Sequence, residues 1–380
     1  MNRPLTLLAS GLSAGALMLG GATFAPAGAE TDPAAGATAT SAAAPYKVLV
    51  VAKTYGFRHS HIDETTNAVI ELGQEHGFTV DVWDPPIPGK SAGQPELSLT
   101  STPFTSTESL SQYATIMFAS PVDGTNSGNA ALPRTLDDAE LAAFQGYIRQ
   151  GGGFVGLHAA TDEMHAVPWF SKLTGGSARF RNHPAQQQAT MRVESPTHPS
   201  TVMLPKAWSR FDEWYNFTAN PRPDVHVLLT LDESTYNPGS GRMGADHPIA
   251  WCHNFEGGRS WYEGAGHVES SYTDPLFLAH LLGGIEWTAG VVEGGGNCVT
   301  WPEVAKINAA AGAGGNRQVK LSGDVADYLA AAKAAADAGD HAKAASILEQ
   351  ARGKAHGLQD RTLVTKVNDL LEWQRGLIGF

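Results

Sequence analysis

The sequence predicts an α/β fold with a doubly wound, mostly parallel sheet, followed by a small bundle of C-terminal helices. Between residues 46 and 162, short apolar segments alternate with longer amphipathic segments of helical period. Such alternation is typical of parallel sheets that are covered by helices. Polar turns containing histidine follow two of the apolar segments, at the edge where open α/β sheets bind ligands. From Leu321 onward, alanine, leucine and charged residues recur at helical spacing, which predicts the bundle.

The first 29 residues are predicted to be a signal peptide. Arg3 precedes an apolar stretch from Leu5 to Phe24, and Ala27-Gly28-Ala29 has the pattern of a cleavage site. A membrane anchor is the alternative, but glycines interrupt the stretch and a second apolar span of about 20 residues does not follow. Residues 30–45 have the composition of a flexible linker. We therefore expect a secreted, extracellular protein.

Composition and charge limit the partners. The 380 residues are 42% hydrophobic and 17% charged, as in a globular protein with many loops. The net charge of −12 argues against nucleic acid and anionic membrane surfaces, because both are polyanions. The two cysteines, Cys252 and Cys298, permit one disulfide in an exported chain. Cys252 also lies in an apolar strand-like segment, so a buried free thiol stays open as the alternative. The lack of CxxC spacing argues against structural zinc.

The elements of the sheet are expected in a regular order. Strands are predicted at 46–52, 78–83, 113–119 and 154–157, helices at 63–76 and 136–150, and a long loop at 85–109. Gly77 stands where the first helix should end. No GxGxxG follows the first strand, which argues against a dinucleotide-binding fold. Further strands are expected at 225–231 and 249–253, and an apolar helix at 275–287 closes the domain.

The segment from Gly151 to Asp162 is the one around which the sheet is organised. A glycine run precedes the apolar residues 154–157, so His158 is placed at the carboxyl end of a buried strand. In a nucleophile elbow this position carries serine or cysteine on a strained turn. Histidine here favours acid–base work or metal binding. The alternative is a strand-end histidine bonded to backbone, and this stretch leaves both open.

Six motifs follow one another in order between Tyr46 and Gly290. They are Lys53-Thr54-x-Gly56-Phe57-Arg58-His59, the segment 152–162, Asp212-Glu213-Trp214-Tyr215, the segment 247–253, Gly258-Arg259 and Gly266-His267. Together they resemble the ThuA-like (trehalose utilisation) family. The resemblance implies a flavodoxin-like or class I glutamine amidotransferase-like fold over residues 46–290. It also implies carbohydrate metabolism, of glucosides or their oxidised 3-keto forms. In that fold the strand-end residue is a catalytic cysteine and here it is His158, so amidotransferase chemistry is not expected.

The C-terminal part is expected to be separate. Residues 291–320 are predicted to be a linker and residues 321–380 a three-helix module, with helices at 322–338, 341–355 and 361–377. Its small core is expected to consist of Leu329, Ile347, Leu348, Leu363, Val367, Leu370 and Leu371. The module faintly resembles the FIMAH-type modules of secreted bacterial enzymes, and a generic spacer or docking bundle is the alternative.

Sugar sites combine aromatic faces, planar hydrogen-bonding groups and groups that transfer protons. The predicted catalytic residues are His158, Asp162, Asp212, Glu213, His247 and His267. The predicted substrate-binding residues are Arg58, His59, Trp214, Trp251, His253 and Arg259. For each tryptophan the alternative is core packing. Neighbouring side chains of an extended chain point to opposite faces. One of Asp212 and Glu213 should therefore face the site, and we expect Asp212.

These residues predict a carbohydrate-processing enzyme with hydrolase- or lyase-type chemistry, in which imidazoles and carboxylates transfer protons to or from a small carbohydrate. The alternative is a non-catalytic carbohydrate-binding or sensing protein with the same site. The absence of GxSxG and of an elbow cysteine argues against an amidase or peptidase. A divalent metal held by His158 and His267 could supply an electrophile. No HExxH spacing supports it, so the cofactor stays unassigned.

The predicted cleavage site gives a direct test of export. The mature protein should begin near Glu30, because Ala27-Gly28-Ala29 is the cleavage motif. N-terminal sequencing of the protein recovered from the culture medium measures this. Recovery of a chain that still begins at Met1 would contradict the signal-peptide prediction.

Overall fold

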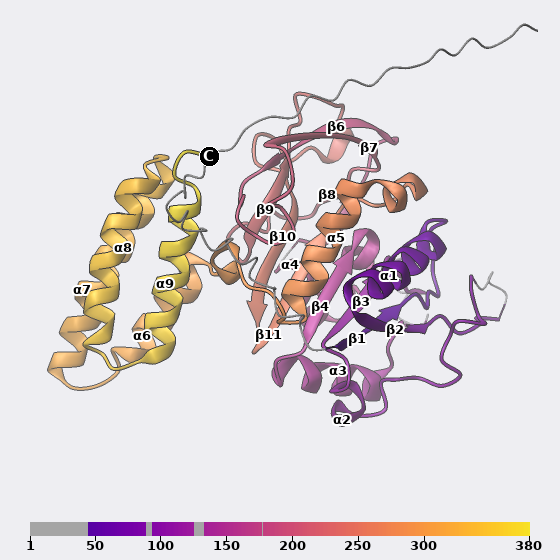
Figure 1. Cartoon of the computed structure of the whole chain (residues 1–380), viewed down its shortest axis with the longest axis horizontal. Helices are drawn as coiled ribbons and strands as arrows, with labels where there is room; N and C mark the ends of the chain where they lie inside the picture. Colours follow the sequence, from indigo (N-terminus) through magenta and orange to yellow (C-terminus); the bar gives the residue numbers. More distant parts are fainter. Residues whose placement is uncertain (1–44, 89–92, 125–132, 177) are drawn as a thin grey trace, which may run out of the picture. The chain divides into compact units, whose positions relative to one another are not determined.

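The computed structural model describes residues 45–88, 93–124, 133–176 and 178–380. The predicted signal peptide and almost all of the predicted linker at 30–45 lie outside the described residues. The described chain from Tyr46 onward contains a large mixed sheet with helices on both faces and a set of C-terminal helices (Figure 1). Among the described residues, no helix is both long enough and apolar enough to cross a membrane.

The main sheet has nine strands in the order β2-β1-β3-β4-β11-β10-β9-β6-β7. The first five run parallel to one another and the remaining pairs are antiparallel. The strands of the parallel half are β2 (Phe78–Trp83), β1 (Tyr46–Val51), β3 (Thr115–Ala119), β4 (Gly153–Leu157) and β11 (Gly258–Glu263). Those of the antiparallel half are β10 (Pro248–Phe255), β9 (His226–Leu231), β6 (Gln187–Val193) and β7 (Ala207–Asp212). A second sheet pairs β5 (Phe180–Asn182) with β8 (Asn216–Phe217).

Helices cover both faces of the parallel half, so the doubly wound α/β prediction is confirmed. The helices α1 (Ile62–His76) and α5 (Pro275–Thr288) contact each other on one face. The other face carries α2 (Thr107–Leu110), α3 (Asp138–Arg149) and α4 (Pro168–Gly175) (Figure 1). The loop predicted at 85–109 does hold the short helix α2, whose start is fixed by a capping box between Ser106 and Ser109.

The glycine run before β4 has a packing reason. Gly153 pairs in register with Thr115 of β3 and Arg259 of β11. A Cβ atom on Gly153 would lie 2.3 Å from the carbonyl oxygen of Thr288, at the end of α5. The backbone of β4 can therefore approach α5 only because this residue has no side chain. Every residue of β4 is buried, which agrees with the predicted central strand.

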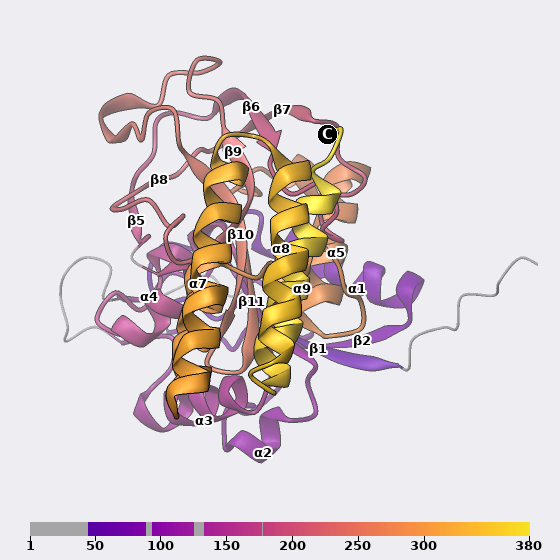
Figure 2. The same ribbon diagram turned by 90° about the vertical axis from the view of Figure 1, so that its left-hand side faces the viewer.

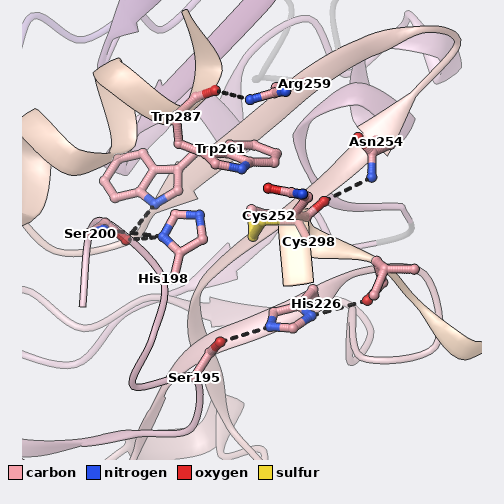
Figure 3. Close-up of a disulfide and its surroundings, with 12 residues drawn as sticks. Ser195, His198, Ser200, His226, Cys252, Asn254, Arg259, Trp261, Trp287 and Cys298 are labelled. Atoms are coloured by element: carbon pink, nitrogen blue, oxygen red, sulfur yellow. Dashed lines mark hydrogen bonds between the residues drawn. A yellow bond between two sulfur atoms is a disulfide. The ribbon is translucent and has the colours of Figure 1, made fainter. Parts of the chain in front are cut away.

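The two cysteines form the disulfide that the sequence permits, so the alternative of a buried free thiol at Cys252 is excluded. Cys252 lies on β10, and Cys298 ends the 3₁₀ helix Gly295–Cys298 (Figure 3). Close to the disulfide, Nδ1 of His226 donates a hydrogen bond to the carbonyl oxygen of Val299, 3.1 Å away, and its Nε2 lies 2.9 Å from Ser195 Oγ. The bridge ties the chain that follows α5 back to the sheet.

The prediction of a linker at 291–320 is wrong in its details. Beside the 3₁₀ helix, the segment contains α6 (Trp301–Ala311). Thr300 and Glu303 form a capping box and Pro302 occupies the first turn, which are ordinary signals of a helix start. The segment was predicted as a linker from its Gly- and Ala-rich composition. Alanine is common in linkers but is also the best helix former, so composition alone does not separate the two.

The three predicted C-terminal helices are present as α7 (Asn316–Asp337), α8 (His341–His356) and α9 (Arg361–Gly376). They pack side by side (Figure 2). Asp340 and Asp360 cap the starts of α8 and α9. The predicted core residues are buried except Ile347, which is only partly buried. The ring of Trp373 on α9 lies 4.2 Å from that of His226, between ring centroids.

Removing the disulfide should lower the stability of the fold. The double variant Cys252→Ala, Cys298→Ala should lose about 2–4 kcal/mol in the free energy of unfolding, since the bridge restricts the unfolded chain. Guanidinium chloride unfolding of both proteins under non-reducing conditions measures the difference. Reductant should destabilise the wild-type protein and leave the variant unchanged. Equal unfolding midpoints without reductant would contradict the stabilising role.

Candidate functional site

Four side chains from four distant parts of the sequence meet at one edge of the sheet. His59 follows β1, His158 follows β4, Glu213 follows β7 and His267 follows β11. One nitrogen or carboxylate oxygen of each lies within 4.8 Å of those of the others. The strands concerned point the same way, so their carboxyl ends share an edge. We refer to His59, His158, Glu213 and His267 as the His–Glu cluster.

His158 stands directly after β4 in a backbone conformation that L-residues rarely adopt. Its φ angle is 45°, in the left-handed region, at the point where the strand turns into the 3₁₀ helix His158–Asp162. The Nδ1 atom lies 2.8 Å from the carbonyl oxygen of Gly264. A carbonyl can only accept, so Nδ1 carries the proton and Nε2 faces the cluster. This strained turn at the predicted position is typical of functional sites.

His158 is completely buried. Its ring packs 4.1 Å from that of Tyr215 and about 5 Å from those of His59 and His267, between centroids. Truncation to alanine would therefore leave a cavity and place alanine at a positive φ angle. Asparagine tolerates this conformation better, so His158→Asn is the more informative variant.

Glu213, and not Asp212, is the carboxylate that faces the imidazoles, so the predicted choice between them is wrong. Its Oε2 atom lies 3.3 Å from Nε2 of His158 and 3.2 Å from Nδ1 of His267. Its Oε1 atom lies 3.1 Å from Nδ1 of His183. Both oxygens of Glu213 are thus engaged by histidine rings.

Asp212 has a different task at the same edge. Its buried carboxylate accepts hydrogen bonds from the backbone N–H groups of Gly266 and His267, each at 2.9 Å, and from that of Glu213, also at 2.9 Å. Arg210 lies 3.6 Å away as a counter-charge. Asp212 therefore positions His267 and does not itself face the cluster.

Three polar neighbours were not among the predicted site residues. The side chain of His183 is 42% exposed and contacts Glu213 at the rim. His61 is completely buried, with its Nδ1 atom 3.0 Å from Thr65 Oγ1 and 3.2 Å from the hydroxyl of Tyr272. The Tyr272 hydroxyl also donates to the carbonyl oxygen of Gly266. His61 lies two residues after His59, in the same segment that follows β1. This spacing was the sequence signal that could have placed it near the site.

The cluster shifts the proton affinity of its members in opposite directions. Burial, with the nearby rings of His158 and His267, lowers the pKa of His59 to about 2. Burial also lowers the pKa of His61 well below its ordinary value. For Glu213, burial opposes ionisation, but the close contacts with His158 and His267 outweigh it and lower the pKa. For His267, burial is outweighed by the hydrogen bond and charge of Glu213, which raise the pKa.

Four other predicted residues have structural partners away from the cluster. His247 is buried between the carboxylate of Glu233, at 3.0 Å, and the carbonyl oxygen of Tyr215, at 2.9 Å. His253 bonds to the carbonyl oxygen of Leu173. The indole N–H groups of Trp214 and Trp251 donate to backbone carbonyls, and both side chains are completely buried. For the tryptophans this is the core packing that the sequence left open.

The remaining predicted residues form ion pairs. Arg58 is held by two acids, Asp84 and Asp63, at 2.8 Å each. It lies beside His59 in the chain, so it stiffens the turn after β1. Asp162 pairs with His165 at 2.9 Å. Arg259 donates to the carbonyl oxygen of Trp287 (Figure 3) and pairs with Glu293 at 2.7 Å.

The chain matches a family model described as ThuA, trehalose utilisation, over residues 47–288. A ThuA-like protein from Bacteroides uniformis has a similar structure, with 26% identity, a TM-score of 0.52, and coverage of 67% of this chain and 95% of that one. A ThuA-like protein from Parabacteroides merdae shares 20% identity at a TM-score of 0.47, with coverage of 65% and 90%. No curated protein matches this chain. The resemblance predicted for residues 46–290 is thereby confirmed.

The electrostatic coupling inside the cluster can be tested in metal-free protein. Glu213→Gln should lower the pKa of His267, because the neutral amide cannot stabilise an imidazolium. An NMR titration of the ¹³C-labelled imidazole measures the change. Glu269→Gln is the matched control: Glu269 acts on His267 only through its charge, so the pKa should fall less. An unchanged pKa in Glu213→Gln would contradict the arrangement.

Proposed function

This chain belongs to the ThuA (trehalose utilisation) family, and we propose that it is a secreted enzyme acting on a glucoside or its oxidised 3-keto form. The family supports a carbohydrate-related role. The convergence of three imidazoles and one carboxylate within 4.8 Å is the observation that carries the catalytic part. A site that only binds sugar needs few titratable groups, whereas proton transfer needs several in contact.

The rim of the site offers a path for a proton. The side chain of Glu213 is almost buried and joins His183 on one oxygen to His267 on the other. The side chains of His183 and His267 are 42% and 17% exposed, so a substrate reaches these two rings first. Two imidazoles bridged by one carboxylate can act as acid and base at neutral pH. Both steps of an acid–base reaction then have a partner on the protein.

An exposed aromatic ring stands beside this rim. Phe57 is 65% exposed, and its ring packs edge-on against that of His59, 4.9 Å away between centroids. Aromatic faces suit the apolar C–H surface of a sugar. Phe57 lies in the Gly56-Phe57-Arg58-His59 motif. We assign it the role of a stacking surface for the substrate ring.

The chemistry follows from these groups. In a 3-keto sugar the hydrogen beside the carbonyl is acidic, so a positioned base can remove it and an acid can protonate the departing oxygen. Each well-positioned acid or base contributes on the order of 10²–10⁴ to the rate. The His183–Glu213–His267 row can supply both, while the buried ring of His158 holds Glu213 in place.

The experiment is a product screen with glucosides and their 3-keto forms. Glu213→Gln should reduce kcat by a factor on the order of 10² or more, because the amide cannot accept a proton from either histidine. The variant keeps the size of the side chain, so circular dichroism should show an unchanged fold. Full turnover in the folded variant would contradict the proposal. Sugar binding without turnover in the wild-type protein would favour the non-catalytic alternative.

Two phenylalanine variants serve as a matched pair in the same assay. Phe57→Ala should raise KM more than it lowers kcat, since the ring contacts the sugar away from the reacting atoms. Phe211 is 51% exposed on β7, and its neighbour in the chain, Asp212, is buried. Phe211→Ala should leave both constants unchanged. Equal effects of the two variants would remove the assigned role of Phe57.

A further inference from the structure

The His–Glu cluster has the donor set and the spacing of a metal centre. We infer that His59, His158, Glu213 and His267 bind one divalent first-row transition ion, for which Zn²⁺ is the probe. This inference deepens the proposed function, since it concerns the same site.

The distances between the donor atoms match those around a tetrahedral ion. Metal–nitrogen and metal–oxygen bonds to zinc are about 2.0–2.1 Å, so neighbouring ligand atoms lie roughly 3.3 Å apart. Nε2 of His158, Nδ1 of His267 and Oε2 of Glu213 are separated by 3.1, 3.2 and 3.3 Å. The three atoms form a triangle of nearly equal sides. These separations allow all three atoms to bind one ion.

Hydrogen bonds alone do not account for the three close contacts between these atoms. Nδ1 of His158 donates to Gly264, so Nε2 has no proton when the ring is neutral. Ionised Glu213 has none to offer. Nδ1 of His267 then supplies at most one proton for three contacts, and the other contacts bring lone pairs together. A cation interacts favourably with all of these lone pairs at once.

His59 provides the independent observation. The residue is only 5% exposed, and its Nδ1 atom has no hydrogen-bond partner among the described residues. A buried polar atom without a partner is costly. The ring lies in contact with those of His158 and His267. A bound ion would give this histidine the partner that the described chain does not.

The surroundings hold the ligands as in known metal sites. Metal-bound histidines usually donate their second nitrogen to a carbonyl or carboxylate, and His158 does so toward Gly264. The second oxygen of Glu213 is engaged by His183, and Asp212 fixes the backbone of His267. The site is thus organised before an ion enters.

The donor set selects the class of ion. Three imidazoles and one carboxylate suit zinc, copper, iron or nickel, whereas magnesium and calcium prefer oxygen ligands. A second group of potential ligands in the described chain, His198 with Cys252 and Cys298, has its sulfurs in the disulfide. It has no thiolate to offer an ion.

A bound ion would change which residues transfer protons at the site. It would polarise a carbonyl or activate a water, which supplies the electrophile that carbonyl chemistry requires. His267 would then be occupied as a ligand. His183 lies outside the ligand set: its Nδ1 atom contacts the far oxygen of Glu213 and the carbonyl oxygen of Pro184, so the ring can still carry the proton.

The test measures metal binding and not activity. The full chain, treated with chelator, is dialysed and titrated with Zn²⁺ by calorimetry, and its metal content is then determined by mass spectrometry. We expect about one ion per chain in the wild-type protein. Glu213→Gln and His267→Ala should each weaken the affinity at least about 100-fold, a loss at or beyond the range that supporting residues alone produce. His253→Gln, which changes a buried histidine outside the cluster, should keep the wild-type affinity.

The absorption spectrum of bound Co²⁺ reports the ligand set even where a variant is less stable than the wild-type protein. Co²⁺ bound to the wild-type protein should show the visible absorption of a four-coordinate site, and the cluster variants should lose it while His253→Gln keeps it. Absence of Zn²⁺ binding by the wild-type protein would overturn the inference, and so would equal affinity in all folded variants. Sugar turnover by a wild-type protein that fails to bind Zn²⁺ would refute the ion and leave the proposed function intact. Zn²⁺ binding at the cluster without sugar turnover would support the ion and contradict the proposed enzymatic function.

Discussion

The site depends on the carboxylate of Asp212, which joins the end of β7 to the turn after β11. Charge-assisted hydrogen bonds to backbone are among the stronger ones in proteins, and here three backbone N–H groups share one buried acid. One of those groups belongs to His267 and another to Glu213. The two residues that contact each other in the cluster are therefore held by a single neighbour.

The mixed sheet explains how residues so far apart in the sequence reach one point. In the parallel half, β1, β4 and β11 deliver His59, His158 and His267 at a shared edge. The antiparallel half reverses direction strand by strand, and β7 again points the same way. Glu213 can thus join from the other half.

The sequence predicted the strands and the strand-end position of His158 because apolar runs and glycines are local signals. The structure brings His158, Glu213 and His267 together from the predicted list, but the sequence did not show which atoms of these residues contact one another. Alternation along β7 shows that Asp212 and Glu213 face opposite sides; which side holds the site depends on β11, which is distant in sequence. The same limit applies to His247 and His253, whose partners are backbone carbonyls 32 and 80 residues away. His183 was missed because its loop has no periodic pattern.

The central claim, that the substrate meets the protein at the His–Glu cluster, has one direct test. It is a crystal structure of the Glu213→Gln variant soaked with a glucoside or its 3-keto form. We predict that the sugar lies within hydrogen-bond distance of His183 or His267 and packs on Phe57. A cavity of about 480 Å³ elsewhere, lined by Arg222, Trp301 and Trp373 among others, is the rival location. Sugar bound in that cavity, with the cluster unoccupied, would contradict the account.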